Sequence, residues 1–164
     1  MTTEEFLIRP AEAGDHDDLK RGLIALQEYE CALHDSRLDA MASADPYLIW
    51  MLREIVEHDG LCLVASQGGR FIGFIAGWIE REENPAETLD STTFGYISDI
   101  CLLPAWRGLG FSKPLLLAME RYFAGKTVRR LRISALAANQ PALAAYRSAG
   151  FQPYEVTLEK VLSR

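Results

Sequence analysis

The sequence has 164 residues, which is enough for one domain of ordinary size and leaves little room for a second hydrophobic core. Hydrophobic residues make up 49% and charged residues 24%, close to the average for globular proteins, so a disordered or fibrous chain is a poor fit. The formal net charge of −6 argues against nucleic-acid binding, because neutralising phosphates requires an excess of Lys and Arg. We therefore expect a single domain over residues 1–164.

The N-terminal sequence MTTEEFLIRP is polar and acidic, unlike a signal or transit peptide. No apolar run approaches the roughly 18 residues that a membrane-spanning helix needs. These features predict a cytoplasmic protein that makes no contact with membranes.

Cysteines and histidines give no metal-binding pattern. The cysteines form no C-x-x-C pair, which argues against a zinc ribbon and a disulfide framework, and the histidines have no ligand spacing: Cys31, Cys62, Cys101, His16, His34 and His58. We predict free thiols and no metal site.

The first half of the chain predicts a strand, two helices and a hairpin. A short strand over residues 6–9 ends at Pro10, and a helix follows from Gly14-Asp15. A second helix is expected to open at Asp45-Pro46 and to end at Gly60. Apolar runs over 61–65 and 71–79 flank a glycine-containing turn, which is typical of a hairpin.

The second half alternates strands and helices. After a charged loop over 80–90, we expect a strand over 94–103, a helix over 110–123 and a strand over 130–135. Asn139 caps a last helix that reaches Ala149, and extended segments over 151–153 and 154–162 close the chain. The predicted order is βααβββαβαββ, a mixed α/β fold.

A glycine-containing turn between the strand at 94–103 and the next helix is the strongest functional signal. Gly108 and Gly110 let the backbone approach an anion, and the first turn of the helix has N–H groups without helical partners. Two glycines alone are equally consistent with an ordinary strand–helix turn.

Two motifs resolve that ambiguity through a family resemblance. Arg107, Gly110 and Ser112 form R-x-x-G-x-S after Pro104 and Trp106, and residues 139–151 read N-x-x-A-x-x-x-Y followed by Gly-Phe. Both motifs, in this order, resemble the GNAT superfamily of acyl-CoA N-acyltransferases over nearly the whole chain. The family pattern has Gly or Ala at position 112 and usually alanine at 114, where this chain has Ser112 and Pro114.

The resemblance implies a mostly antiparallel sheet of seven strands with about four helices, splayed to admit acetyl-CoA. It implies contacts to acetyl-CoA from thirteen residues: Ile100, Cys101, Leu102, Arg107, Gly108, Leu109, Gly110, Phe111, Ser112, Lys113, Asn139, Ala142 and Tyr146. Tyr146 is expected to protonate the thiolate, and the backbone N–H of Leu102 to bind the thioester oxygen. Helical geometry independently gives Asn139 and Tyr146 one face, although a lone tyrosine there is also typical of core packing.

Asp99 is the expected general base, with Glu80, Glu82 or a water as alternatives and a purely structural role for Asp99 as another. The expected acceptor side includes Tyr29, Glu80 and Asp99.

Charge is uneven along the chain. Residues 107–132 carry a net charge of +6, whereas residues 28–45 and 80–90 each carry −4. We interpret the positive segment as steering CoA and the acidic segments, which the resemblance assigns to the acceptor side, as attracting a cationic amine; solvated surface is the alternative.

The predicted function is transfer of an acetyl group from acetyl-CoA to a primary amine, either a small molecule (a polyamine, an aminoglycoside or an amino-acid-like amine) or a protein amine. A non-catalytic acyl-CoA sensor or interaction module of the same fold is the alternative. We also expect a homodimer.

Overall fold

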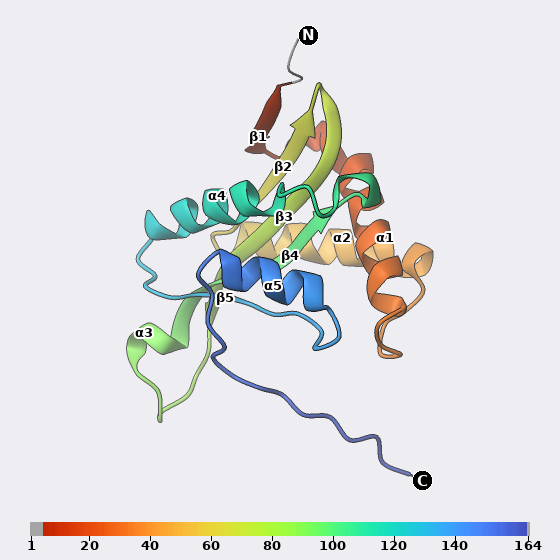
Figure 1. Cartoon of the computed structure of the whole chain (residues 1–164). Helices are drawn as coiled ribbons and strands as arrows, with labels where there is room; N and C mark the ends of the chain where they lie inside the picture. Colours follow the sequence, from red (N-terminus) through yellow and green to blue (C-terminus); the bar gives the residue numbers. More distant parts are fainter. Residues whose placement is uncertain (1–4, 164) are drawn as a thin grey trace.

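The computed structural model describes residues 5–163 (Figure 1). Its strands are β1 (Phe6–Pro10), β2 (Leu61–Gln67), β3 (Arg70–Arg81), β4 (Thr93–Leu102) and β5 (Leu131–Ile133). Its α-helices are α1 (His16–Cys31), α2 (Ala40–Glu57), the single turn α3 (Leu89–Thr92), α4 (Ser112–Ala124) and α5 (Gln140–Ser148). Short 3-10 turns, η1 (Ala13–Asp15) and η2 (Pro104–Trp106), precede α1 and follow β4.

The strands form one sheet in the order β1-β2-β3-β4-β5. Each neighbouring pair from β1 to β4 is antiparallel, whereas β4 and β5 run parallel. The parallel pair is joined only from Gly95–Leu131 to Ile97–Ile133. Beyond Ile97, β4 continues to Leu102 without this neighbour.

Helices cover both faces of the sheet (Figure 1). On one face Leu19 and Leu23 of α1 and Leu48 and Met51 of α2 pack on the sheet around Trp78. On the other face, α4 packs through the buried side chains Leu115, Leu116, Met119 and Phe123. Burial of these apolar stripes on both sides is what fixes β3 as a strand without a polar face.

The start of α2 differs from the prediction. The helix begins at Ala40, because Asp39 caps it by accepting a hydrogen bond from the Ala42 N–H at 2.9 Å. Pro46 therefore lies inside the helix and does not open it. The sequence pattern favoured Pro46 as a first-turn residue, but an upstream cap adds a turn and a half to the helix.

The last two predicted strands are wrong. Residues 149–163 contain no strand, and the backbone of this segment forms hydrogen bonds only at its start, the last from Phe151 N–H to Tyr146 O. Val156 and Leu158, whose alternation suggested a strand, are 76% and 89% exposed. An alternating sequence can be extended, but a strand also needs a neighbour to pair with, and none of the described residues supplies one.

The other nine predicted elements occur in the predicted order, so the mixed α/β class with a mostly antiparallel sheet is confirmed, with five strands in the described residues. Within residues 5–163, no helix has both the length and the apolar character needed to cross a bilayer.

Candidate active site

The site lies where β4 and β5 separate. A cavity of about 1000 Å³ opens beside the unpaired end of β4. It is lined by four parts of the chain: β4 between Tyr96 and Leu102, the α1–α2 region, the turn between β4 and α4, and the segment from Ser134 to Tyr146 that includes most of α5. Because strand pairing stops at Ile97, main-chain groups farther along β4 are available to a ligand.

A β-bulge at Ser98 sets the direction of the next side chain. Asp99 is opposite Ala76 and Ile97 is opposite Gly77, so Ser98 is an extra residue on β4. The Ser98 hydroxyl donates to Ala76 O at 3.3 Å. A bulge changes which residues face each side of the sheet, and here it turns Asp99 toward α2.

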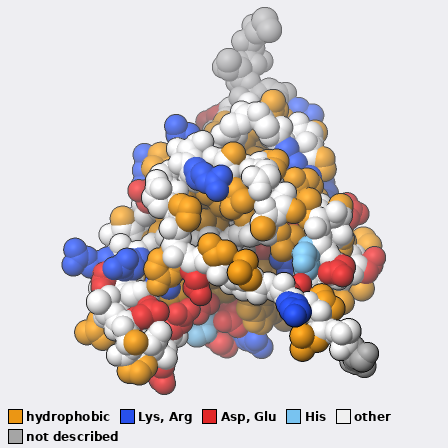
Figure 2. Space-filling model, turned by 60° about the horizontal axis from the view of Figure 1, so that its bottom comes forward, with side chains coloured by type: hydrophobic (Ala, Val, Ile, Leu, Met, Phe, Trp, Pro, Cys, Tyr) orange, Lys and Arg blue, Asp and Glu red, His pale blue; other side chains and the backbone are white. Residues whose placement is uncertain are grey.

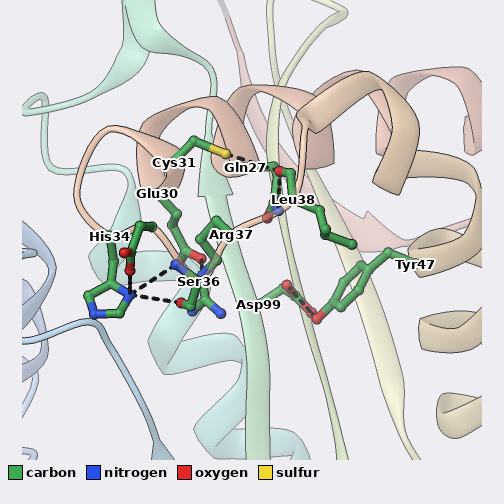
Figure 3. A network of polar contacts seen from close by, with 10 residues as sticks. Gln27, Glu30, Cys31, His34, Ser36, Arg37, Leu38, Tyr47 and Asp99 are labelled. Atoms are coloured by element: carbon green, nitrogen blue, oxygen red, sulfur yellow. Dashed lines mark hydrogen bonds and ion pairs between the residues drawn. The ribbon is translucent and has the colours of Figure 1, made fainter. Parts of the chain in front are cut away.

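Asp99 is buried at 6% exposure, and its carboxylate accepts the hydroxyl of Tyr47 at 3.0 Å to each oxygen (Figure 3). Burial raises the pKa of Asp99 to about 6, while the hydrogen bonds from Ser98 and Tyr47 partly oppose that rise. A carboxylate with such a pKa is ionised at neutral pH and is a stronger base than an exposed aspartate.

The end of β4 also presents a backbone donor. Leu103 N–H donates to Ile72 O of β3, whereas Leu102 O accepts from Arg107 Nε at 2.9 Å on the opposite edge. Since successive residues of a strand direct their backbone groups to opposite edges, the Leu102 N–H points into the gap beside β4. This is the orientation expected of a donor to a thioester oxygen.

The glycine turn carries a set of backbone donors. Gly108 and Gly110 have φ values of 74° and 87°, a conformation that glycine adopts without strain. Among the described residues, no acceptor pairs with the backbone N–H groups from Gly108 to Ser112. α4 starts at Ser112, two residues later than predicted, so Pro114 lies in its first turn, where a missing N–H costs nothing.

Arg107 serves the protein's own backbone. Its guanidinium donates from Nε to Leu102 O and from Nη2 to Ala25 O at 3.1 Å, and it lies 5.1 Å from the centre of the Tyr29 ring. Arg107 thus ties the end of β4 to α1. Two of its N–H donors are therefore already paired with main-chain carbonyls.

α5 borders the cavity on the other side. Asn139 Oδ1 accepts from the Ala142 N–H at 3.2 Å and caps the helix, as predicted. Ala142 and Tyr146 line the cavity together with Asn139. Burial and the nearby carboxylates of Glu30 and Asp99 raise the pKa of Tyr146, so its hydroxyl stays protonated through the neutral range. Within residues 5–163 that hydroxyl has no hydrogen-bond partner, although its ring packs 6.3 Å from Phe151.

The cavity unites most of the predicted site residues. Those that line it are Tyr29, Asp99, Ile100, Cys101, Leu102, Arg107, Gly108, Ser112, Asn139, Ala142 and Tyr146. Leu109, Gly110, Phe111 and Lys113 belong to the adjoining turn and do not line it. Phe111 instead packs against Phe6 and Trp106, with ring centres 5.1 and 5.6 Å apart.

Glu80 is not among the lining residues. Its carboxylate accepts from Trp78 Nε1 at 2.6 Å, and nothing else from residues 80–90 reaches the cavity. The acidic loop after β3 therefore does not border this cavity, and Glu80 and Glu82 as alternatives for the base stay predictions.

The positive segment is likewise dispersed. Lys126 pairs with Asp59, Arg130 pairs with Asp90, and Arg132 donates to Ser91, all away from the turn. On the face drawn in Figure 2, Lys and Arg side chains are interspersed with acidic and hydrophobic ones. Three of the seven cations in residues 107–132 are thus engaged by other parts of the chain.

Sequence reasoning missed Tyr47 and Arg37 as site residues. Tyr47 lies 52 positions from Asp99 and carries no local signal of that contact. Arg37 had been counted only as the single cation of an acidic segment, but it lines the cavity and pairs with Glu30 at 2.7 Å.

One group of side chains has metal-ligand spacing. Glu54, Glu57 and His58 bring their ligand atoms within 4.8 Å of one another at the end of α2, outside the cavity. Exposed acidic groups of this kind are common without a metal, and the prediction that no metal is bound stays a prediction.

Comparison with known proteins gives the class. Residues 24–151 match the Acetyltransferase (GNAT) family, which is more than half of the chain. The protein belongs to this family, as the two motifs predicted.

Individual relatives agree with this assignment. The chain is 30% identical over 88 residues to the uncharacterized N-acetyltransferase YycN of Bacillus subtilis strain 168, and the match covers 54% of each protein. It thus spans about half the length of that curated relative.

Solved structures confirm the fold. A GCN5-related N-acetyltransferase from Ralstonia eutropha JMP134 has a TM-score of 0.71 at 22% identity, over 96% of this chain and 99% of that one. The aminoglycoside N-acetyltransferase AAC(6')-Iy in complex with CoA has a TM-score of 0.69 at 18% identity, over 97% and 95%.

Proposed function

We propose that the protein is an N-acetyltransferase that transfers the acetyl group of acetyl-CoA to a primary amine. The observation that carries the proposal is the pairing of a buried carboxylate, Asp99, with a half-buried phenol, Tyr146, on one cavity between β4 and β5. A base and an acid on opposite sides of one cleft suit a reaction that moves a proton at each end.

The glycine turn fits the co-substrate. Unpartnered N–H groups from Gly108 to Ser112 suit a pyrophosphate, and the first turn of α4 adds the positive end of its dipole. Ala142 is small and leaves room on α5 for the pantetheine arm. When bound, acetyl-CoA supplies the acetyl group as a thioester.

Asp99 acts at the amine. It accepts a proton from the amine nitrogen, directly or through water, as the nitrogen bonds to the carbonyl carbon. Its raised pKa, about 6, favours that transfer at neutral pH while keeping the carboxylate ionised beforehand. The Leu102 N–H donates to the carbonyl oxygen while negative charge develops there.

Tyr146 acts at the sulfur. As the C–S bond breaks and the electron pair moves to sulfur, the phenol gives its proton to the thiolate. The products are an amide and CoA thiol, and the proton held by Asp99 returns to solvent, from which Tyr146 is reprotonated. The raised pKa of Tyr146 keeps the phenol protonated before each turnover.

The acceptor is an amine, and its predicted cationic character has lost part of its support. Of the two acidic segments, residues 80–90 do not reach the cavity. Within residues 28–45, the charged residues that line the cavity are Glu30 and Arg37, and their opposite charges cancel. A polyamine, an aminoglycoside, an amino-acid-like amine and a protein amine remain in the proposal. A homodimer and a cytoplasmic location also remain predictions.

The test is consumption of acetyl-CoA across a panel of amines, with a thermal-shift measurement for acetyl-CoA alone. We expect acetyl-CoA to raise the melting temperature and at least one amine to release CoA thiol. A thermal shift without turnover of any amine would favour the non-catalytic sensor. No thermal shift would contradict both functions.

A further inference from the structure

The charges on the cavity wall are balanced. Its ionisable acidic side chains are Glu30 and Asp99, and its cationic side chains are Arg37 and Arg107. A wall with equal numbers of acids and bases does not select a polycation, so the acceptor must be recognised by the arrangement of individual charges.

The two arginines differ in how many of their N–H donors remain unpaired. Arg107 uses Nε and Nη2 on backbone carbonyls of β4 and α1. Arg37 forms an ion pair with Glu30, with Nε and Oε2 2.7 Å apart, and no hydrogen bond from its Nη atoms occurs among the described residues. Among the described residues, neither Nη atom of Arg37 has a partner, so a pair of parallel N–H donors stays available on the cavity wall.

The segment that carries Arg37 is held by its own hydrogen bonds (Figure 3). Leu38 O accepts from Gln27 Nε2 at 2.9 Å and from Cys31 Sγ at 3.0 Å. On the other side, Ser36 N–H donates to His34 Nδ1 at 3.2 Å. Bonds on both sides of Arg37 hold its backbone, and the ion pair with Glu30 holds its side chain at the cavity wall.

The Glu30–Arg37 pair also acts within reach of the reaction centre. Glu30 and Arg37 line the same cavity as Tyr96 and Asp99 of β4, and Glu30 contributes to the raised pKa of Asp99. A ligand group on Arg37 therefore lies in the same compartment as the base.

We infer that Arg37 binds a carboxylate of the acceptor, which makes the substrate an amine that also carries a carboxylate. This inference rests on the proposed function. The guanidinium fork matches a carboxylate in a bidentate geometry, and Glu30 keeps the fork in place through Nε. The zwitterion of an α-amino acid adds no net charge to the cavity, in keeping with its balanced wall.

The surfaces around Arg37 indicate the rest of the acceptor. Leu26, Leu38, Tyr29, Tyr47 and Tyr96 line the same cavity with apolar or aromatic surface. Such a wall suits an apolar or aromatic side chain. The substrate class is therefore an α-amino acid with an apolar side chain.

Matched substrates test the inference. L-Phenylalanine, L-phenylalaninamide and phenethylamine share the amine and the ring, but only the first has a carboxylate. We expect kcat/KM for L-phenylalanine to exceed the other two by at least about 10-fold, a preference worth one or two charge-assisted hydrogen bonds. In Arg37→Met the preference should disappear through a higher KM for L-phenylalanine, with kcat nearly unchanged.

Two further variants separate recognition from structure. The double variant Glu30→Gln/Arg37→Met leaves no unpaired carboxylate and should behave as Arg37→Met does. Arg53→Met removes an exposed arginine of α2 that pairs with Glu54 outside the cavity, and should leave the preference intact. Binding of L-phenylalanine and phenethylamine to the CoA-loaded protein, measured by calorimetry, gives a readout that does not need turnover.

The outcomes divide cleanly. Equal use of the three amines, or a preference that survives Arg37→Met, overturns the inference while the proposed function stands. Failure of L-phenylalanine to bind more tightly than phenethylamine to the CoA-loaded protein also overturns it. If no amine is acetylated but the carboxylate preference in binding depends on Arg37, the inference stands and the proposed function fails.

Discussion

The two edges of β4 show how one strand serves both the fold and the site. Its β3 edge is paired from Thr93 to Leu102, interrupted only by the bulge at Ser98, whereas its β5 edge is paired over three residues. On the first edge, the neighbouring residues Ile75 and Ala76 of β3 are completely buried. The second leaves backbone donors and the Asp99 carboxylate beside a cavity.

The site exists because β5 pairs with only three residues of β4 and leaves the rest of that edge open. A fully paired neighbour would occupy the Leu102 N–H and fill the gap with side chains. On the closed edge, substitutions should therefore change stability. On the open edge, they should change chemistry and leave the free energy of unfolding nearly unchanged.

Asp99→Asn should show the largest effect on the open edge. Losing the base is expected to lower kcat by about 10²- to 10⁴-fold at pH 8. Burial raises the pKa of Asp99 above its unfolded value, so ionised Asp99 is unfavourable for the folded state above pH 6 and the neutral amide should not destabilise it. Steady-state kinetics and thermal unfolding check both points.

The matched control is Asp45→Asn on α2, which removes a carboxylate paired with Lys20 outside the cavity. Its kcat should equal that of the wild type. An Asp99→Asn enzyme within about threefold of the wild-type kcat would show that a water or another group is the base.

Tyr146→Phe should be next, with a loss of roughly 10- to 10²-fold in kcat, because a thiolate with a thiol pKa near 8.5 is a tolerable leaving group without an acid. Binding of acetyl-CoA should change little. Tyr122→Phe is the control, since that hydroxyl donates to the Asp59 and Gly60 carbonyls and should affect stability only. A wild-type kcat in Tyr146→Phe would reduce Tyr146 to a packing residue.

The parts of this comparison that the sequence predicted are local ones. The glycine turn, the Asn139 cap and the succession of the first nine elements depend on residues close together in the chain, where periodicity and capping act. The resemblance then identified Asp99 and Tyr146, and the fold brings them to one cavity.

The parts it could not predict depend on distant contacts. Arg107 bonds to Ala25, 82 positions away, and no motif indicates which carbonyl a guanidinium will find. The charge of Glu80 suggested a place on the acceptor side, but its carboxylate accepts a hydrogen bond from the indole of Trp78, two residues earlier. The alternating apolar residues Val156 and Leu158 are compatible with a strand, but a strand forms only beside a neighbouring strand, and both side chains are exposed.

Gly110→Asp tests the turn that continues the open edge. A carboxylate added beside the unpartnered N–H groups should weaken acetyl-CoA binding at least about 10-fold, which corresponds to 1.4 kcal/mol. Gly69→Asp is a close control, because Gly69 also has a positive φ, 76°, and open space around its Cα, but lies in the β2–β3 hairpin. Calorimetry that finds a Kd within about twofold of the wild type would move the pyrophosphate site elsewhere.

Tyr47→Phe should give the smallest effect, and one that depends on pH. The Tyr47 hydroxyl donates to both oxygens of Asp99, which favours the ionised form and lowers its pKa against the effect of burial. Without that hydroxyl the pKa rises above about 6, and a hydrogen bond of about 1.4 kcal/mol corresponds to one pKa unit. The acid limb of the kcat/KM profile should then shift upward by about one unit, with activity at pH 6 about fivefold lower and activity at pH 8.5 unchanged. A residue that only packs α2 on the sheet would lower activity equally at every pH. A uniform loss of activity would therefore give Tyr47 a structural role only. A shifted acid limb would show that Tyr47 helps to set the pKa of the base, Asp99.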